Sequence, residues 1–445
     1  MHNVLDPCDL VPDEAQQLAH SGYSVGSLHD SAQAAASAGD HQTLSEIVKA
    51  LAKIDRDSSW AYEEPADESS LLQSLSGIQP LPLDPDQIHD RIRGAWLGRT
   101  VGNTLGKPVE GLTRAEVENY LKAAGQWPQT GYIPLLSPLP VGVSHLHESA
   151  PFASAGTFTD VPRDDDIDWT ILGLHLMETY GRGLSTEQIA TEWLDRIPFT
   201  QTFTAERAAY RNLICGQQPP QTATTSNPYR EWIGALIRAD IFGYVNPGDP
   251  AEAARLALVD ARLSHVGNGI YGEMWAAALV AAAFSTASPR FSLGVALDVV
   301  PPTSRLAEAL REILNLFDRG ATSIDALAWV DEHLGHYNWV HTINNAALIS
   351  TGLLWGRGFM DTLAITISGG RDTDSTAATV GSVFGALHGS SSIPQALVGT
   401  THVHVRSAIR DFDRITIDAL SDRTARLALA SHRREVVGAN PRPRP

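Results

Sequence analysis

The sequence predicts an all-α protein, folded as a compact bundle of many helices. From Asp86 to about Ala430 apolar residues recur with helical spacing, as in the amphipathic segments 303–317 and 323–334. Segment 272–284 is rich enough in alanine for two helices to approach each other closely. Alternation typical of strands is scarce, and no repeat of about 20–50 residues is visible. These observations favour helices packed on helices over any sheet-based architecture.

Composition places the chain among acidic globular proteins. It has 445 residues, 43% of them hydrophobic, and a formal net charge of −18. This charge disfavours nucleic acids and membranes as partners, because both are bound through surface lysine and arginine. The longest apolar run, 274–284, is too short for the ~20 residues of a membrane span. The N-terminus is acidic where a secretory signal is basic, and two cysteines cannot build a disulfide framework, so we expect a cytoplasmic protein.

Charge and proline content divide the chain into three parts. Residues 1–85 hold fourteen acidic and three basic residues, one clearly helical stretch at 43–54 and a proline-rich end. We interpret them as an acidic, partly ordered helical extension. Residues 86–430 form the expected main domain, and residues 431–445 are expected to be a disordered tail.

Two groups of aspartates lie about two hundred residues apart, each directly before an apolar helix. Their members are Asp164, Asp165, Asp166 and Asp168 in the first group, and Asp372 and Asp374, followed by Ser375, in the second. One aspartate is enough to cap a helix, so four within five positions need another explanation. Crowded carboxylates repel one another unless a cation neutralises them, and oxygen ligands without His or Cys suit Mg²⁺, Mn²⁺ or Ca²⁺. We therefore favour a metal site that bridges both groups over solvated helix caps.

A third element is the glycine-patterned segment 93–110. Four glycines recur at every fourth position: Gly94, Gly98, Gly102 and Gly106. They place a smooth stripe on one face of a helix, which permits close backbone packing. Pro108 then ends the helix and leaves Glu110 just beyond its C-terminus. Such a glutamate, taken alone, is usually a surface charge.

Together the three elements resemble the ADP-ribosylglycohydrolase family, which includes the dinitrogenase reductase-activating glycohydrolases. That family shows G-x-x-x-G-x-P-x-E near its start, T-D-D before its second long helix and a late G-G-D-x-D-T, and their order and spacing match residues 88–390. The resemblance implies an all-α bundle around two divalent cations, Mg²⁺ with Mn²⁺ as the alternative, that bind ribose hydroxyls. By position, it implies catalytic roles for Glu110, Asp165 and Asp166. The implied metal ligands are Asp164, Asp165, Asp166, Asp372, Asp374 and Ser375.

The chain departs from the family pattern at several positions. Asn103 stands where the family often has Asp, and Asp164 replaces Thr. Arg371 is inserted before Asp372, and Asp168 is an extra acid. These changes indicate a divergent branch that keeps the metal core and alters the wall around the substrate.

Polar residues inside apolar segments are candidates for substrate binding. His265 and Asn268 precede the alanine-rich segment, and Asn345 opens another apolar helix. Asparagine amides can hydrogen-bond a ribose or an amide group. We expect these three residues to bind substrate, with satisfied core or capping residues as the alternative.

The predicted function is metal-dependent hydrolysis of the glycosidic bond at C1 of an ADP-ribosyl or related ribosyl group, with an ADP-ribosylated protein as a candidate substrate. Two alternatives stay open: a non-catalytic module that binds ADP-ribose or a nucleotide, and a hydrolase of a free N-ribosyl small molecule. Residues 372–376 also fit the D-x-D-x-T motif of haloacid-dehalogenase-like phosphatases. That class is disfavoured, because its chemistry needs a downstream lysine and the chain has none after Lys122.

Overall fold

The structure of the chain, a computed structural model, describes residues 3–438. Within this range 22 α-helices follow one another, and the strands are the two-residue β1 (His404–Val405) and β2 (Ile415–Thr416), paired antiparallel. The prediction of an all-α fold is therefore confirmed. No helix in the described range combines the length and the apolar character needed to cross a membrane.

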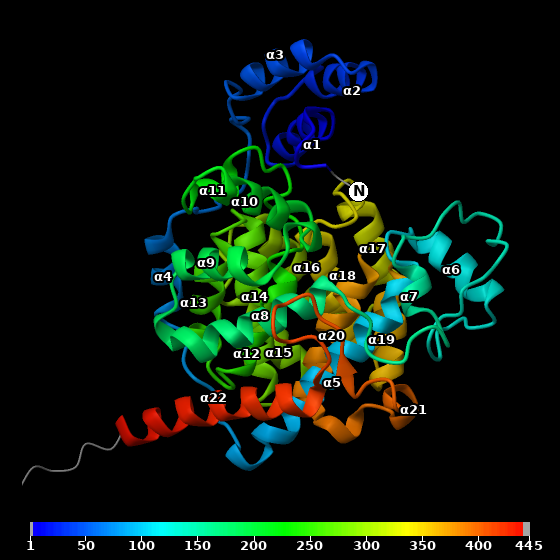
Figure 1. Cartoon of the computed structure of the whole chain (residues 1–445), viewed down its shortest axis with the longest axis vertical. Helices are drawn as coiled ribbons and strands as arrows, with labels where there is room; N and C mark the ends of the chain where they lie inside the picture. The colour runs from blue at the N-terminus through cyan, green and yellow to red at the C-terminus, as the bar shows by residue number, and fades with distance from the viewer. Residues whose placement is uncertain (1–2, 439–445) are drawn as a thin grey trace, which may run out of the picture.

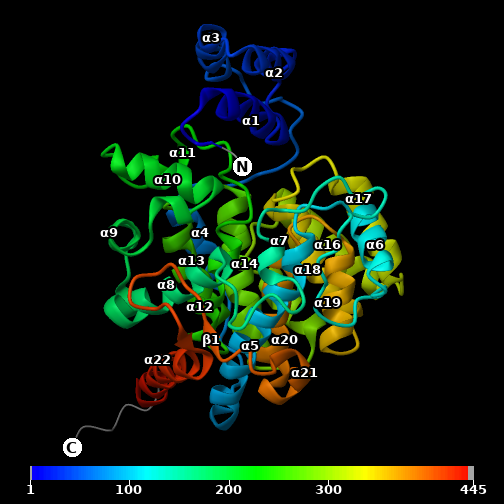
Figure 2. The ribbon, with the colours of Figure 1, turned by 45° about the vertical axis from the view of Figure 1, so that its right-hand side comes forward.

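The most extensive helix–helix contact joins α5 (Ile88–Gly106) to α20 (Thr373–His388), which lie side by side in Figures 1 and 2. The glycine stripe of α5 makes this contact. A Cβ atom at Gly98 would lie 1.9 Å from the carbonyl oxygen of Gly381, and one at Gly102 would lie 2.1 Å from that of Ala377. The two backbones therefore touch directly, as the four-residue glycine spacing predicts, because glycine alone lacks the atom that would keep them apart.

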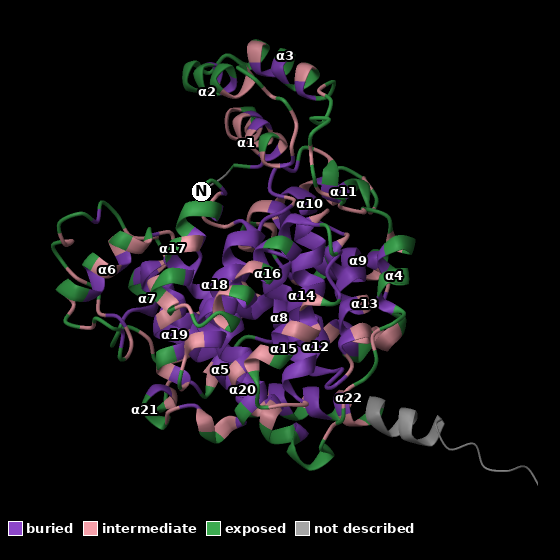
Figure 3. Ribbon diagram, turned by 180° about the vertical axis from the view of Figure 1, so that it is seen from behind, coloured by how far each residue is buried: buried purple, intermediate pink, exposed green. Residues whose placement is uncertain are grey.

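The remaining helices of the main body pack around this pair, and the more deeply buried ones, called inner helices here, are mostly purple in Figure 3. The inner helices are α8 (Asp165–Tyr180), α12 (Asp240–Tyr244), α13 (Pro250–Ala261), α14 (Asn268–Ala283) and α18 (Thr342–Trp355). The outer helices are α6 (Arg114–Ala123), α7 (Ala150–Ala153), α9 (Thr186–Arg196), α10 (Thr204–Ile214), α11 (Gln221–Thr224), α15 (Pro289–Leu297), α16 (Arg305–Asp318), α17 (Ser323–Leu334), α19 (Phe359–Ser368), α21 (Gln395–Val398) and α22 (Ile417–Gly438). Helix α14 is buried along its whole length, as its run of alanines predicts.

The N-terminal extension contains the helices α1 (Pro7–His20), α2 (Leu28–Ala38), α3 (His41–Leu51) and α4 (Glu68–Leu75). Helices α1 to α3 stand at the end of the molecule opposite α22, whereas α4 lies against α13 of the main body (Figure 1). The first three share a small apolar core of their own, which includes Val11, Leu44 and Ile47. The predicted boundary near residue 85 stays a prediction, and so does the predicted tail of residues 431–445. Residues 431–438 of that tail belong to α22, and residues 439–445 lie outside the described part of the chain.

A buried charge network joins the extension to the main body. Arg305 of α16 pairs with Glu64 of the extension at 2.8 Å and with Glu231 of the main body at 2.8 Å. Gln17 of α1 donates to the same Glu231 carboxylate at 2.8 Å. Such charges are stable in the interior only when each is paired and hydrogen-bonded, so this network needs groups from both parts of the chain.

Candidate metal centre and cavity

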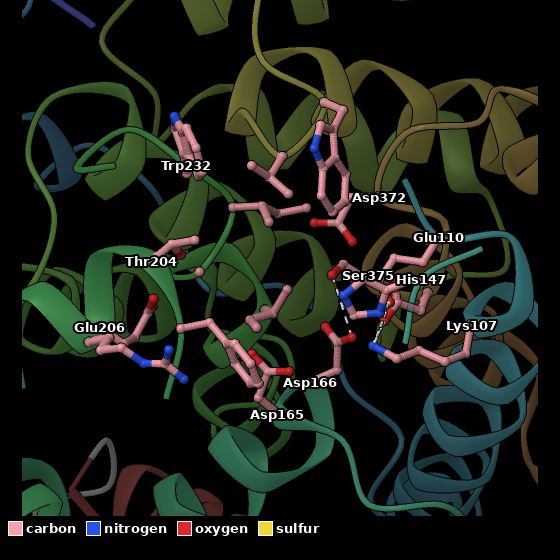
Figure 4. A pocket seen from close by; sticks show the side chains of 18 residues that line it. Lys107, Glu110, His147, Asp165, Asp166, Thr204, Glu206, Trp232, Asp372 and Ser375 are labelled. Atoms are coloured by element: carbon pink, nitrogen blue, oxygen red, sulfur yellow. Dashed lines mark hydrogen bonds and ion pairs between the residues drawn. The ribbon is translucent and has the colours of Figure 1, made fainter. Parts of the chain in front are cut away.

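Three helix ends meet at one place in the bundle (Figure 4). The first is the C-terminal end of α5, continued by the 3-10 turn η2 (Lys107–Val109) to Glu110. The second is the N-terminus of α8, where Asp164 caps the helix by accepting from the backbone N–H of Asp166 at 3.1 Å. The third is the N-terminus of α20, which begins directly after Asp372. Aspartates about two hundred positions apart in the sequence therefore line one cavity.

Side chains of α5 fix the first turn of α8. Arg99 is fully buried and donates to the backbone carbonyl of Asp166 at 2.6 Å and to the carboxylate of Asp240 at 2.7 Å. Asn103 donates its amide to Asp164 at 3.1 Å and to Asp166 at 3.0 Å. An amide donor at this place stabilises ionised carboxylates, whereas an aspartate would add to their repulsion.

The inserted Arg371 has a structural role in the loop before α20. Gly370 and Arg371 have φ values of +66° and +68°, and a Cβ atom at Gly370 would lie 2.6 Å from the carbonyl oxygen of Leu112. The backbone N–H of Arg371 donates to that carbonyl at 2.8 Å, and its own carbonyl accepts from the N–H of Gly111 at 2.9 Å. The insertion therefore ties the segment after Glu110 to the start of α20.

The carboxylate oxygens form two sets that can each hold a cation. The sets are Glu110, Asp372 and Asp374, and Asp164, Asp166 and Asp374, each with ligand atoms within 4.8 Å of one another. Asp374 belongs to both. The Oδ1 atoms of Asp166 and Asp374 are buried without a hydrogen-bond partner among the described residues, which is costly unless a cation meets them. The donor set consists of hard oxygens and so fits Mg²⁺, Mn²⁺ or Ca²⁺.

The two other expected ligands lie beside these sets. Asp165 lines the cavity without belonging to either set, and the hydroxyl of Ser375 donates to Asp166 at 3.4 Å. Glu110 accepts from the imidazole of His147 at 3.0 Å and from the hydroxyl of Ser149 at 3.3 Å. The structure therefore gathers every acid that the sequence assigned to catalysis or metal binding.

Sequence reasoning missed Lys107, whose ammonium lies among these carboxylates. Its Nζ atom is 2.6 Å from Asp374, 2.7 Å from Asp164 and 2.8 Å from Glu110, and the residue is 8% exposed. The chain has only four lysines, and this one stands three positions before Glu110 at the end of the glycine helix. The scarcity of lysine is the one feature of the sequence that could have singled out Lys107.

Lys107 divides the carboxylates into two classes. Burial opposes ionisation of Asp164, but the ammonium outweighs it and holds the pKa of Asp164 at about 2. Burial likewise opposes ionisation of Glu110, and Lys107 with His147 still brings its pKa below the usual value. For Asp166 and Asp372, burial and neighbouring carboxylates raise the pKa well above the usual value. Without a cation these last two carboxyl groups therefore favour the protonated form, and a bound divalent cation would favour their ionisation.

A cavity of about 140 Å³ opens from the acidic centre. Aromatic and aliphatic side chains form much of its wall: Phe203, Trp232, Ile233, Ile237, Trp339 and Val340. Glu206, on the side away from Glu110 in Figure 4, is held by Arg238 at 2.5 Å. Sequence reasoning did not find Phe203, Trp232 or Glu206, since nothing near them in the sequence marks them as neighbours of the aspartates.

Comparison with known proteins gives the family. A model of the ADP-ribosylglycohydrolase family matches residues 84–434. The chain belongs to the ADP-ribosylglycohydrolase family. Membership supports a glycohydrolase function, and the resemblance predicted from the three motifs is confirmed at the level of the family.

Two further matches were found. An uncharacterised protein of Archaeoglobus fulgidus is 25% identical over 302 residues, which cover 67% of this chain and 88% of that protein. A solved chain described as an ADP-ribosylglycohydrolase-related protein complex is 20% identical, with a TM-score of 0.44, and the alignment covers 77% of this chain and 99% of that chain.

The three residues expected to bind substrate do not line the cavity. Asn268 donates its amide to Glu231 at 2.9 Å, inside the network that holds the N-terminal extension. His265 is buried with its Nδ1 atom 2.8 Å from the hydroxyl of Ser264. Asn345 is also buried, and donates to the carbonyl of Trp339 at 2.8 Å, so it supports one wall of the cavity from behind. Their part in substrate binding stays a prediction.

Asp168 faces away from the cavity and joins α8 to a distant loop. Its buried carboxylate pairs with Arg163 at 2.8 Å and accepts from the hydroxyl of Ser407 at 2.6 Å and the N–H of Ala408 at 3.0 Å. We expect Asp168→Ala to lower the free energy of unfolding by about 3 kcal/mol, because three donors lose a buried acceptor. Denaturant unfolding measures this, and Mn²⁺ affinity should stay within a few-fold of wild type. A stable variant that loses Mn²⁺ would instead place Asp168 in the metal centre.

Proposed function

We propose that this chain is a divalent-cation-dependent hydrolase that cleaves the glycosidic bond at C1 of an ADP-ribosyl or related ribosyl group. The observation that carries the proposal is the pair of oxygen sets that share Asp374 beside a cavity with aromatic walls. Mg²⁺ is the proposed cation, with Mn²⁺ as a substitute, because every ligand is a hard oxygen.

Different groups of the centre have different proposed roles in hydrolysis. Cleavage at C1 passes through an oxocarbenium-like state and needs a held ribose, a water and a proton acceptor. A divalent cation, when bound, supplies charge that orients ribose hydroxyls and makes water more acidic. Asp165 is the best-placed acceptor, because it lines the cavity and belongs to neither oxygen set. Asp166 and Glu110 remain the other proposed catalytic carboxylates.

The aromatic wall of the cavity favours one alternative substrate, a free N-ribosyl small molecule. The cavity itself has a volume of about 140 Å³, and a second cavity of about 420 Å³, lined by Lys107 and Asp164 among others, borders the same acidic centre. Trp232, Trp339 and Phe203 offer flat apolar surface on which a planar base or leaving group can stack. A ribosyl group with a planar leaving group therefore suits this wall, and the second cavity leaves room for an ADP moiety.

One experiment tests the reaction and separates the candidates. The full chain is incubated with Mg²⁺ and, in turn, peptides ADP-ribosylated on arginine or serine and a panel of nucleosides, and released ribose or ADP-ribose is measured by mass spectrometry. We expect turnover of at least one ribosyl substrate, its loss on adding EDTA and its return with excess Mg²⁺. Calorimetric binding of ADP-ribose without turnover of any substrate would favour a non-catalytic binding module.

A further inference from the structure

Lys107 places a permanent positive charge between the two oxygen sets. It contacts Glu110 of the first set, Asp164 of the second and Asp374, which is common to both, at 2.6–2.8 Å. An ammonium group has three N–H donors, and here each has a carboxylate partner. The ammonium therefore lies where a cation shared by these three carboxylates would lie.

The backbone holds Lys107 in this position. Gly106, the residue before it, is packed so closely on α20 that a Cβ atom there would lie 2.2 Å from the carbonyl oxygen of Thr373. Pro108 follows it and fixes its own φ within the turn η2. With the residue 8% exposed, the ammonium has little access to water as an alternative partner, so it is a built-in part of the centre.

The remaining oxygens mark room for one further cation. Lys107 is paired with neither Asp166 nor Asp372, and its bond to Asp374 uses only Oδ2. The Oδ1 atoms of Asp166 and Asp374 are buried without hydrogen-bond partners among residues 3–438. These two oxygens, and the carboxylate of Asp372, have no ion pair with the ammonium. Asp372 shares an oxygen set with Asp374, so both sets keep oxygens that a divalent cation could bind.

We propose that Lys107 takes the place of one of two divalent cations, so that this chain binds a single ion, with Asp374, the carboxylate common to both oxygen sets, among its ligands. The proposal rests on the proposed function only in that the centre binds a divalent cation. It replaces the sequence-based expectation of two ions. It also assigns Lys107 a positioning role: the ammonium keeps Glu110 and Asp164 ionised and in place without offering a coordination site to substrate or water.

The number of bound ions tests the proposal. Metal-free full-length wild type and Lys107→Met, which keeps the aliphatic stem and removes the charge, are titrated with Mn²⁺ by calorimetry and examined by electron paramagnetic resonance. We expect one ion in wild type with the spectrum of an isolated Mn²⁺. We expect two ions in Lys107→Met with an exchange-coupled spectrum, since paired ions lie about 3.5–4 Å apart. Lys122→Met, at an exposed lysine paired with Glu118, is the matched control and should bind one ion.

Any other number of bound ions contradicts the proposal. Two coupled ions in wild type overturn it whatever Lys107→Met does, so the test holds even where that variant does not fold. A single ion in both proteins shows that Lys107 does not exclude a second one. No ion in wild type overturns both this proposal and cation dependence, whereas one ion without turnover of any ribosyl substrate overturns only the proposed function.

Discussion

Asp374→Ala is expected to lower kcat/KM by at least about 10³-fold on any ribosyl substrate that the native protein cleaves, equivalent to about 4 kcal/mol of transition-state stabilisation. Asp374 is the one carboxylate common to both oxygen sets, and it also accepts from Lys107 at 2.6 Å. Its loss removes a ligand from whichever set holds the cation and leaves the ammonium one partner short. No other single acid in the centre combines these contacts.

The variant should lose the cation and keep the fold. Asp374 lies in the first turn of α20, where alanine is compatible with the helix, so far-ultraviolet circular dichroism should match wild type. Mn²⁺ titration should show affinity reduced by at least about tenfold, within the range found when support for a metal ligand is removed. Glu332→Gln, an exposed acid on α17, is the control and should keep both activity and Mn²⁺ binding. Wild-type turnover by Asp374→Ala would reject the metal mechanism.

The acids of the centre were predictable because each group carries its own local signal. Asp164 and Asp372 stand at helix N-termini, and both precede runs of apolar residues that can only be buried helices. The glycine spacing of α5 predicts the close contact with another helix that brings Glu110 to the same place. In these cases the residue types next to one another along the chain are enough to predict that the acid belongs to the site.

The rest of the site depends on partners that are distant in sequence. From the sequence alone, Lys107 cannot be told from an ordinary surface lysine. The carboxylates that contact it come from three helix ends, which meet only in the folded protein. Phe203, Trp232 and Trp339 come from three separate segments and form one wall only in the folded protein. Asn268 is of a residue type that often binds ligands, yet its amide donates a hydrogen bond to Glu231, which is distant from it in sequence.

The contact between α5 and α20 therefore determines both how these helices pack and where the charged residues of the centre lie. The C-terminal end of α5 carries Lys107 and Glu110, and the N-terminal end of α20 carries Asp374. Because the two backbones touch along the glycine stripe, the distance between these ends is set by the absence of side chains. Any atom added in the stripe must change the separation of the helices and, with it, the geometry of the centre.

Gly98→Ala is accordingly expected to lower the free energy of unfolding by at least about 3 kcal/mol, at the upper end of the range for overpacking a core. The added methyl group would lie 1.9 Å from the carbonyl oxygen of Gly381, a backbone atom that cannot rotate away, and the gain of about 1 kcal/mol in helix propensity does not offset this clash. Denaturant unfolding measures the loss. The metal-free variant, where it folds, should also bind Mn²⁺ more weakly, since α5 and α20 must move apart.

The matched control separates the clash from any general effect of replacing a helical glycine. Gly294 lies in α15, and a Cβ atom there would meet only the end of the flexible Arg290 side chain, at 3.3 Å. Gly294→Ala should therefore be neutral or raise the free energy of unfolding by about 0.5–1 kcal/mol, the opposite sign. If both variants were equally stable, the α5–α20 contact would not be as close as the structure shows. In that case the glycine stripe could not be what sets the distance between Glu110 and the aspartates of α20.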